Sequence, residues 1–276
     1  MTRLDTKKDE GREDSALVEL EIARVRLDRD RYEHVKDEIV VEDQTELYVN
    51  DVLYAVFSCS PHEIQELVVG HLLTDGVIPK TKGITGLKIT KGSAHIWLAK
   101  KHAPPQDRPR LVSTSCASGT LKIPPHLLMR AHKVKSDSSF TLSRQNVFEA
   151  VKLLDSEASI FRRTGGTHAS ALLDEGGKVL AFSEDIGRHN AVDKVVGKSA
   201  LEGASFARTL LASTGRITFE MVVKAATVGI PVIVSISAPT DKAVRAAGML
   251  GLTLIGFARA RRFNIYTCPE RIEAQL

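Results

Sequence analysis

The C-terminal part of the chain alternates short apolar runs with segments of helical spacing, and this pattern constrains the fold most. The runs are TLLAS at 209–213, PVIVSIS at 231–237 and LTLIGFA at 252–258, and the helical segments between them cover 217–229 and 241–251. The inner runs are continuously apolar, as in strands that are covered on both faces of a sheet. The order strand, helix, strand, helix, strand therefore predicts a three-layer α/β/α sandwich.

The residues before this alternation extend the same domain. Helical spacing predicts a helix over 143–161, and a hairpin is expected from strands at 168–174 and 178–182. A further helix over 189–200 leads to the first apolar run. We therefore place an α/β domain at 141–276.

A smaller α+β module is expected at 26–110. Strands are predicted at 38–41, 46–49 and 52–57, with a turn at Asn50 and Asp51, and a second hairpin joins 86–90 and 94–100. Ser60 to Glu63 has the form of a capping box and predicts a helix over 64–75 that ends at Gly76. Residues 1–25 begin with alternating charges and are expected to be a disordered tail. Residues 111–140 connect the two folded parts.

Composition excludes several classes of protein. The 276 residues include 38 basic and 34 acidic side chains, a net charge of +4, and only 5% aromatic residues. This balance is too mild for a dedicated nucleic-acid binder. No apolar run approaches the roughly 18 residues of a membrane span, and the first 15 residues contain no apolar region, so we expect no secretory signal. The scattered cysteines predict no disulfide framework, so we expect a cytoplasmic protein.

Candidate ligand-binding residues follow the strands of the predicted sheet. Ligands of such sheets bind where the carboxyl ends of the strands lead into loops. Glycine, threonine and arginine recur there, and backbone N–H groups with guanidinium forks hold phosphates. The candidates are Gly165, Gly166, Thr167, His168, Gly187, Arg188, His189, Thr214, Gly215, Arg216, Arg259, Arg261, Arg262 and Asn264. The alternatives are that the glycines and threonines only cap helices and that the arginines form a solvated surface run.

Cys116 is the candidate nucleophile. It lies in STSCASGT, a small and polar segment that would present the thiol on a loop, whereas Cys59 ends the run VLYAVFSCS, which continues the predicted strand, and is expected to be a core residue. Cys268 is interpreted as structural or incidental. No His-x-His, His-Glu-x-x-His or Cys-x-x-Cys spacing occurs, so no zinc site is expected.

Taken together, these segments resemble the FdhD family of formate dehydrogenase accessory sulfurtransferases. The resemblance rests on TGGTHASALLDEGGKVLAFSEDIGRHNAVDKVVG at 164–197, on 213–240, on LGLTLIGFARARRFNIYTCPERI at 250–272 and on 46–78, and it covers about 38–273. It implies a C-terminal domain similar in fold to cytidine deaminases, and a homodimer.

The resemblance also implies a function. Members accept sulfur from a cysteine desulfurase as a persulfide and pass it to the molybdenum bis-molybdopterin guanine dinucleotide cofactor of formate dehydrogenase. It identifies Cys116 as the sulfur-carrying residue. It places the cofactor at the FARARR segment, which consists of Phe257, Ala258, Arg259, Ala260, Arg261 and Arg262. Arg188, or His189 if protonated, would lower the thiol pKa if it lay near Cys116.

One departure from the family pattern concerns the sulfur loop. Many members carry Cys-Gly-x-Cys-Gly, whereas Gly119 stands here where the second cysteine would be. A single carrying thiol remains chemically sufficient.

Three other functions are weighed against this one. A nucleoside deaminase needs His-x-Glu and Pro-Cys-x-x-Cys, but the nearest segment here is His168-Ala169-Ser170. A cofactor-binding chaperone without sulfur chemistry would use the same arginine and glycine loops. A Cys-His hydrolase with His168 or His189 as base lacks an identifiable oxyanion hole.

Overall fold

The computed structural model describes residues 16–29, 31–99, 110–112, 134, 140–259 and 261–273. Its strands are β1 (Leu17–Arg24), β2 (Glu33–Val40), β3 (Asp43–Val49), β4 (Val52–Cys59), β5 (Ile84–Thr90), β6 (Ser93–Leu98), β7 (Arg110–Val112), β8 (His168–Asp174), β9 (Val179–Asp185), β10 (Thr209–Ser213), β11 (Val232–Ser235), β12 (Thr253–Arg259) and β13 (Arg262–Thr267). Its α-helices are α1 (Ile64–Thr74), α3 (Arg144–Ser156), α4 (Ser159–Thr164), α5 (Arg188–Leu201), α6 (Phe219–Val228) and α7 (Asp241–Leu250).

The predicted α/β sheet is present as a six-stranded sheet in the order β13-β12-β11-β10-β8-β9. Strands β10, β11 and β12 are parallel, as the strand–helix alternation predicts, and β8 and β9 form the expected antiparallel hairpin. Alternate strand residues face two separate cores. Leu172, Leu211 and Ile233 share one core with α5, α6 and α7, and the neighbouring residues pack with α3. Helices therefore cover both faces of a mixed α/β fold.

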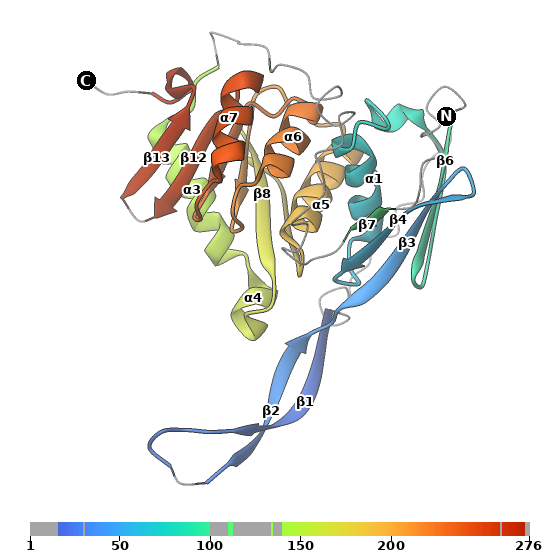
Figure 1. The fold of residues 1–276 in the computed structure, drawn as a ribbon, viewed down its shortest axis with the longest axis vertical. Coiled ribbons are helices and arrows are strands. Elements are labelled where there is room, and N and C mark those ends of the chain that lie inside the picture. The colour runs from blue at the N-terminus through green and yellow to red at the C-terminus, as the bar shows by residue number, and fades with distance from the viewer. Residues whose placement is uncertain are drawn as a thin grey trace.

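The N-terminal module contains a five-stranded sheet in the order β5-β6-β3-β4-β7. Both predicted hairpins are present, and the turn residues Asn50 and Asp51 have φ values of 49° and 67°. Helix α1 lies beside α5 and joins the module to the C-terminal domain (Figure 1). The two helices cross at Gly70 and Gly197, where a Cβ on Gly197 would lie 1.9 Å from the carbonyl oxygen of Glu66. Only glycine permits this approach.

The prediction of a disordered tail over residues 1–25 is wrong for Leu17–Arg24. This segment is β1, which pairs with β2 in an antiparallel arm that extends away from the body of the molecule (Figure 1). Charged side chains of the two strands form cross-strand pairs, such as Lys36 Nζ with Glu19 Oε1 at 2.7 Å. Arg163 on α4 forms an ion pair with Glu38 and fixes the base of the arm. Residues 1–15 lie outside the described part.

The helix predicted over 143–161 is interrupted at Glu157 and Ala158, which separate α3 from α4. The Glu184 carboxylate accepts hydrogen bonds from the backbone N–H groups of Ile160 and Phe161, at 2.9 and 2.8 Å. A buried carboxylate from β9 therefore caps a new helix start.

The prediction of a capping box at Ser60–Glu63 is also wrong. Glu63 has a φ of 53° and makes no side-chain cap to α1. Ser60 instead accepts a hydrogen bond from the N–H of Ile186, and Glu63 pairs with Lys198 at 3.0 Å. Both side chains bind the other domain.

Candidate functional site

The loops singled out in the sequence meet at one edge of the six-stranded sheet, where β9, β10, β11 and β12 end and the antiparallel β8 begins. Thr214 joins two of these loops. Its N–H donates to the carbonyl of Ala169 at 3.0 Å, and its Oγ1 accepts from the Ala169 N–H at 3.0 Å. His168 Nδ1 lies 3.2 Å from the same oxygen. The edge therefore holds His168 and Thr214 in fixed positions.

Gly215 brings a third loop to this edge. A Cβ at this position would lie 2.8 Å from Cβ and Cδ of Arg188, so the arginine stem crosses directly over the glycine. Ser235 donates a hydrogen bond to the carbonyl of Gly215 at 2.7 Å. Arg188 is thereby held beside Thr214 and Gly215, as the clustering of these loops predicts. Arg216 is exposed next to them.

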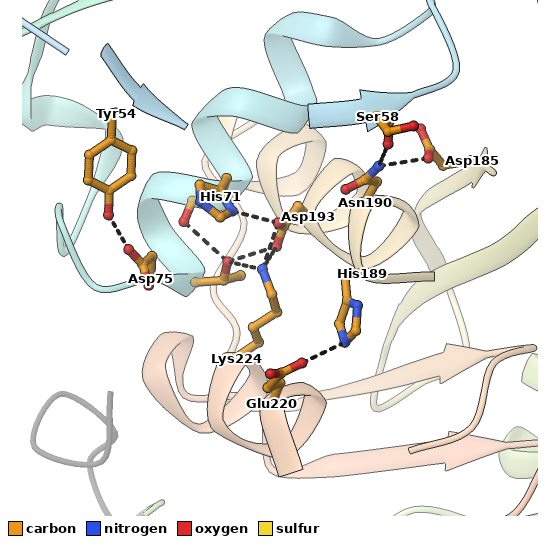
Figure 2. A network of polar contacts seen from close by, with 11 residues as sticks. Tyr54, Ser58, His71, Asp75, Asp185, His189, Asn190, Asp193, Glu220 and Lys224 are labelled. Atoms are coloured by element: carbon orange, nitrogen blue, oxygen red, sulfur yellow. Dashed lines mark hydrogen bonds and ion pairs between the residues drawn. The ribbon is translucent and has the colours of Figure 1, made fainter. Parts of the chain in front are cut away.

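Two long helices start at this edge without a side-chain cap. Helix α5 follows Gly187 and α6 follows Thr218, and neither residue caps its helix through a side chain. Within the described segments, the buried Thr218 Oγ1 has no hydrogen-bond partner, and His189 Nε2 lies 3.4 Å from the carboxylate of Glu220 in the first turn of α6 (Figure 2). Uncapped N–H groups at a helix start favour an anion. This chemistry fits the phosphates of a nucleotide.

Both histidines of the edge are uncharged near neutral pH. Burial lowers the pKa of His189 to about 3, with contributions from the charges of Lys224 and Arg188. Burial and the charge of Arg188 also lower the pKa of His168. His189 therefore does not supply the cation considered above, and Arg188 carries the positive charge here.

A cavity of about 380 Å³ opens beside His168 and Thr214. It is lined mainly by apolar side chains of α3 and α4 and by the loop that precedes β8. The lining includes Val151, Leu154, Ala158, Phe161, Gly165, Gly166, Thr167, Ile186 and Ile236. The cavity offers an apolar surface next to the uncapped helix starts.

Two of the predicted loop residues have structural roles. Thr167 is buried and donates a hydrogen bond to Glu184 at 2.7 Å. Gly165 ends α4 with a φ of 68°. Their place near the edge matches the prediction, but Thr167 is committed to the carboxylate that caps α4.

The arginine-rich segment is only partly a loop. Arg262 and Asn264 lie in β13, and Arg262 pairs with Arg259 across the hairpin, which corrects the expected irregular loop. Phe257 adopts a φ of 52° at a bulge of β12 and is 38% exposed, whereas Ala258 is buried. Arg259 donates to the carbonyl of Ile236 at 3.3 Å. Ala260 lies outside the described residues.

A buried polar cluster behind the edge was not predicted from the sequence. Asp193 on α5 accepts hydrogen bonds from Lys224 Nζ at 2.6 Å and from Thr74 Oγ1 at 2.7 Å, and it lies 3.0 Å from His71 Nδ1 (Figure 2). Burial alone would raise the pKa of Asp193, but the charge of Lys224 and the hydrogen bond from His71 lower it to about 2. The cluster joins α1, α5 and α6.

A second buried cluster is centred on Asp185 of β9 and Lys194 of α5. Their side chains form an ion pair at 2.7 Å, and both are fully buried. Asn190 donates to the carbonyl of Ser58 at 2.8 Å and to Asp185 at 2.9 Å (Figure 2). Ser60 N–H donates to Asp185 at 3.1 Å. These contacts hold the two modules together.

The cysteines differ in their surroundings. Cys59 is fully buried in β4, where burial, with a contribution from the charge of Asp185, raises its pKa to about 12. Cys268 is half-buried and has a φ of 48°. Cys116 lies outside the described residues. Within the described segments, no three His, Cys, Asp or Glu side chains converge as a metal site would require.

These features define a mixed α/β protein with an edge suited to a phosphate-bearing ligand. Comparison with known proteins assigns it more closely: the chain belongs to the FdhD/NarQ family, whose model matches residues 40–273. "Sulfur carrier protein FdhD" of Bacillus subtilis is 34% identical over 86% of this chain and 91% of its own length. The protein of the same name from Methanothermobacter thermautotrophicus is 32% identical over 91% and 98%. That of Staphylococcus haemolyticus is 37% identical over 86% and 90%.

A solved structure supports the fold. A Desulfotalea psychrophila protein described as a formate dehydrogenase accessory protein superposes with a TM-score of 0.79 at 24% identity, covering 94% of this chain and 100% of its own. Among the described helices, none is long and apolar enough to cross a membrane.

Proposed function

We propose that this protein is a sulfur carrier that receives sulfur as a persulfide on Cys116. The donor is a cysteine desulfurase. The acceptor is the molybdenum bis-molybdopterin guanine dinucleotide cofactor that formate dehydrogenase requires. The near full-length match to relatives named as sulfur carriers is the observation that carries the proposal. The proposal includes a cytoplasmic homodimer that contacts the desulfurase and formate dehydrogenase in turn.

The surroundings of Cys59 support the choice of Cys116. A carrier must attack as a thiolate from an accessible position. The pKa of about 12 and the full burial of Cys59 leave it protonated and out of reach near neutral pH. The polar sequence around Cys116 is suited to an accessible thiol.

Loading of the carrier is a thiol–persulfide exchange. The Cys116 thiolate attacks the outer sulfur of the donor persulfide. A new S–S bond forms, the donor S–S bond breaks, and the donor cysteine leaves as a thiolate. No net oxidation occurs. On delivery the S–S bond at Cys116 would break and Cys116 would be released as a thiolate. The outer sulfur would be reduced to sulfide and become a ligand of the acceptor, with the two electrons supplied by the acceptor or by an added two-electron reductant such as a thiol.

The edge of the six-stranded sheet is the proposed binding surface for the acceptor. The uncapped starts of α5 and α6 and the Arg188 guanidinium provide donors for phosphate oxygens. The apolar cavity beside His168 provides space for a ring. The exposed Arg259, Arg261 and Arg262 add positive charge at the same end of β12.

Peptide mass spectrometry without reductant tests the proposal. The protein is incubated with a cysteine desulfurase and cysteine, and one extra sulfur atom is expected on the peptide that contains Cys116. The Cys116→Ala variant should lose this sulfur, whereas Cys268→Ser should retain it. Sulfur confined to another cysteine, or no sulfur at all, would refute Cys116 as the carrier. A Cys116→Ala variant that still activates formate dehydrogenase would favour the chaperone.

A further inference from the structure

The arm formed by β1 and β2 has two unlike faces. In an antiparallel pair, residues directly opposite one another point to the same side, and the sides alternate along each strand. The register therefore places on one side, which we call the charged face, Glu19, Glu21, Lys36 and Glu38. It places on the other side, which we call the apolar face, Val18, Leu20, Ile22, Val35 and Ile39.

The charged face is the one that meets the rest of the chain. Glu38 forms an ion pair with Arg163 of α4. Val40 lies on the same side and packs against Gly166, where an added Cβ would lie 2.5 Å from Cγ1 of Val40. The apolar face points the opposite way, so α4 does not cover it. Leu20 on this face is accordingly 49% exposed.

A two-stranded ribbon with an open apolar face needs a further layer to be stable. An isolated hairpin is at best marginally stable in water unless its hydrophobic face packs on another element. The arm extends away from the body of the molecule (Figure 1), and no described residue of the same chain buries Val18, Leu20 or Ile39. A contiguous exposed apolar surface of this kind marks an interaction site.

The charges beside the apolar face are neutralised within the arm itself. Arg24 lies 3.8 Å from Asp37, and Arg29 forms an ion pair with Glu33. The face therefore offers no unpaired positive charge to a nucleic acid or an anionic lipid surface. A matching partner must be apolar, with its own charges paired. The same face of a second copy has this chemistry.

We infer that the apolar faces of two copies pack on each other, so that the arms join two chains about a two-fold axis. Such a contact requires a self-complementary surface. Exposed apolar side chains continue past the strands at Val25, Leu27 and Tyr32. Together with those of the strands they correspond to roughly 600 Å² per arm, about the lower limit for each partner of a specific interface. The inference rests on the proposed function for the homodimer and adds the surface that forms it.

Sedimentation equilibrium of the full chain tests the inference. Leu20→Lys places a charge on the apolar face opposite Asp37, so the new side chain keeps a cross-strand partner within its own arm. It should raise the Kd of the dimer about a hundredfold or more, because the interface contains the substituted residue twice. Ala23→Lys is the matched control, because Ala23 is exposed on the charged face, and its Kd should equal that of the wild type. An unchanged Kd in Leu20→Lys would overturn the inference.

Photo-cross-linking identifies the contact without relying on a destabilising variant. Benzoylphenylalanine in place of Leu20 is irradiated in a mixture of isotopically light and heavy chains. Cross-links should join it to residues 17–40 of the other chain, whereas the same group in place of Ala23 should form few. Cross-links confined to one chain would show that another segment of that chain covers the apolar face, which would refute the arm contact.

Sulfur loading separates this inference from the proposed function. A chain that dimerises through its arms but takes up no sulfur on Cys116 would refute the carrier role and support the arm contact. A chain that loads sulfur on Cys116 but stays monomeric at every concentration tested would refute the arm contact and support the carrier role.

Discussion

The contact between α1 and α5 makes a sharp prediction for Gly197→Ala. The added Cβ would lie 1.9 Å from the carbonyl oxygen of Glu66 and 2.8 Å from the backbone nitrogen of Gly70. A carbon–oxygen contact normally needs about 3.3 Å, so the helices must separate by about 1.4 Å. Because the opposing atoms belong to backbone, no side-chain rotation can relieve the overlap.

Two opposing contributions set the change in folding free energy of Gly197→Ala. Overpacking typically costs about 1–3 kcal/mol, and more where rigid backbone is displaced. Alanine gains about 1 kcal/mol over glycine from helix propensity. We therefore expect Gly197→Ala to lose about 2 kcal/mol of folding free energy, which lowers Tm by about 4–8 °C for a chain of this size.

Thermal unfolding followed by circular dichroism measures this shift. Gly248→Ala is the matched control, because Gly248 also lies in a helix and its Cβ would meet only a methyl group of Thr267, at 3.7 Å. The control should keep or raise Tm, since only the propensity term remains. A Gly197→Ala variant at least as stable as the wild type would refute the reasoning about the helix contact.

Other predictions concern charge, thiol access and the arm. The depressed pKa of Asp193 means that its contribution is complete above its ordinary pKa of 3.8 and is lost as pH falls toward about 2. Asp193→Asn should therefore destabilise the protein at pH 7 by about 3–5 kcal/mol, and urea midpoints should show this loss shrinking below pH 4. Cys59 should resist iodoacetamide at pH 7 until urea unfolds the chain, whereas reaction at the native rate of an exposed thiol would contradict its burial. Arg163→Gln should accelerate amide exchange in Glu33–Val40 with little change in Tm, and unchanged exchange would show that the Glu38 pair does not hold the arm.

The sequence predicts those elements of the fold whose signal lies within their own residues. Strands β10, β11 and β12 were predictable because a strand covered on both faces must be continuously apolar, and the turn at Asn50 because these residues tolerate positive φ. The break between α3 and α4 was not predictable, because it depends on the Glu184 carboxylate, which reaches the helix from β9. The arm was not predicted because the charged side chains of Leu17–Arg24 indicate a solvated segment until their cross-strand partners on β2 are known.

The candidate site likewise has one part that the sequence predicts and one part that it does not. Strand order alone predicts that Arg188, Thr214 and Gly215 share one edge, and the structure brings them into contact. The cluster around Asp193 was missed because its partners lie on helices far away in the sequence. A signal was present, since Asp193 and Lys194 interrupt an otherwise apolar stretch of α5. Charged residues there must be paired if the helix is buried.

The segment from Asp185 to Lys194 therefore contributes both to the contact between the two modules and to the edge of the six-stranded sheet. Asp185, Asn190 and Lys194 are committed to buried contacts that join the modules, so they are not available to a ligand. Arg188 and the uncapped start of α5 lie at the sheet edge. Because both sets belong to the same helical start, the contacts with Ser58 and Ser60 fix the position of the groups that face a bound anion. The N-terminal module thus contributes to the site by holding α5 in place, even though none of its described side chains lines the cavity beside His168.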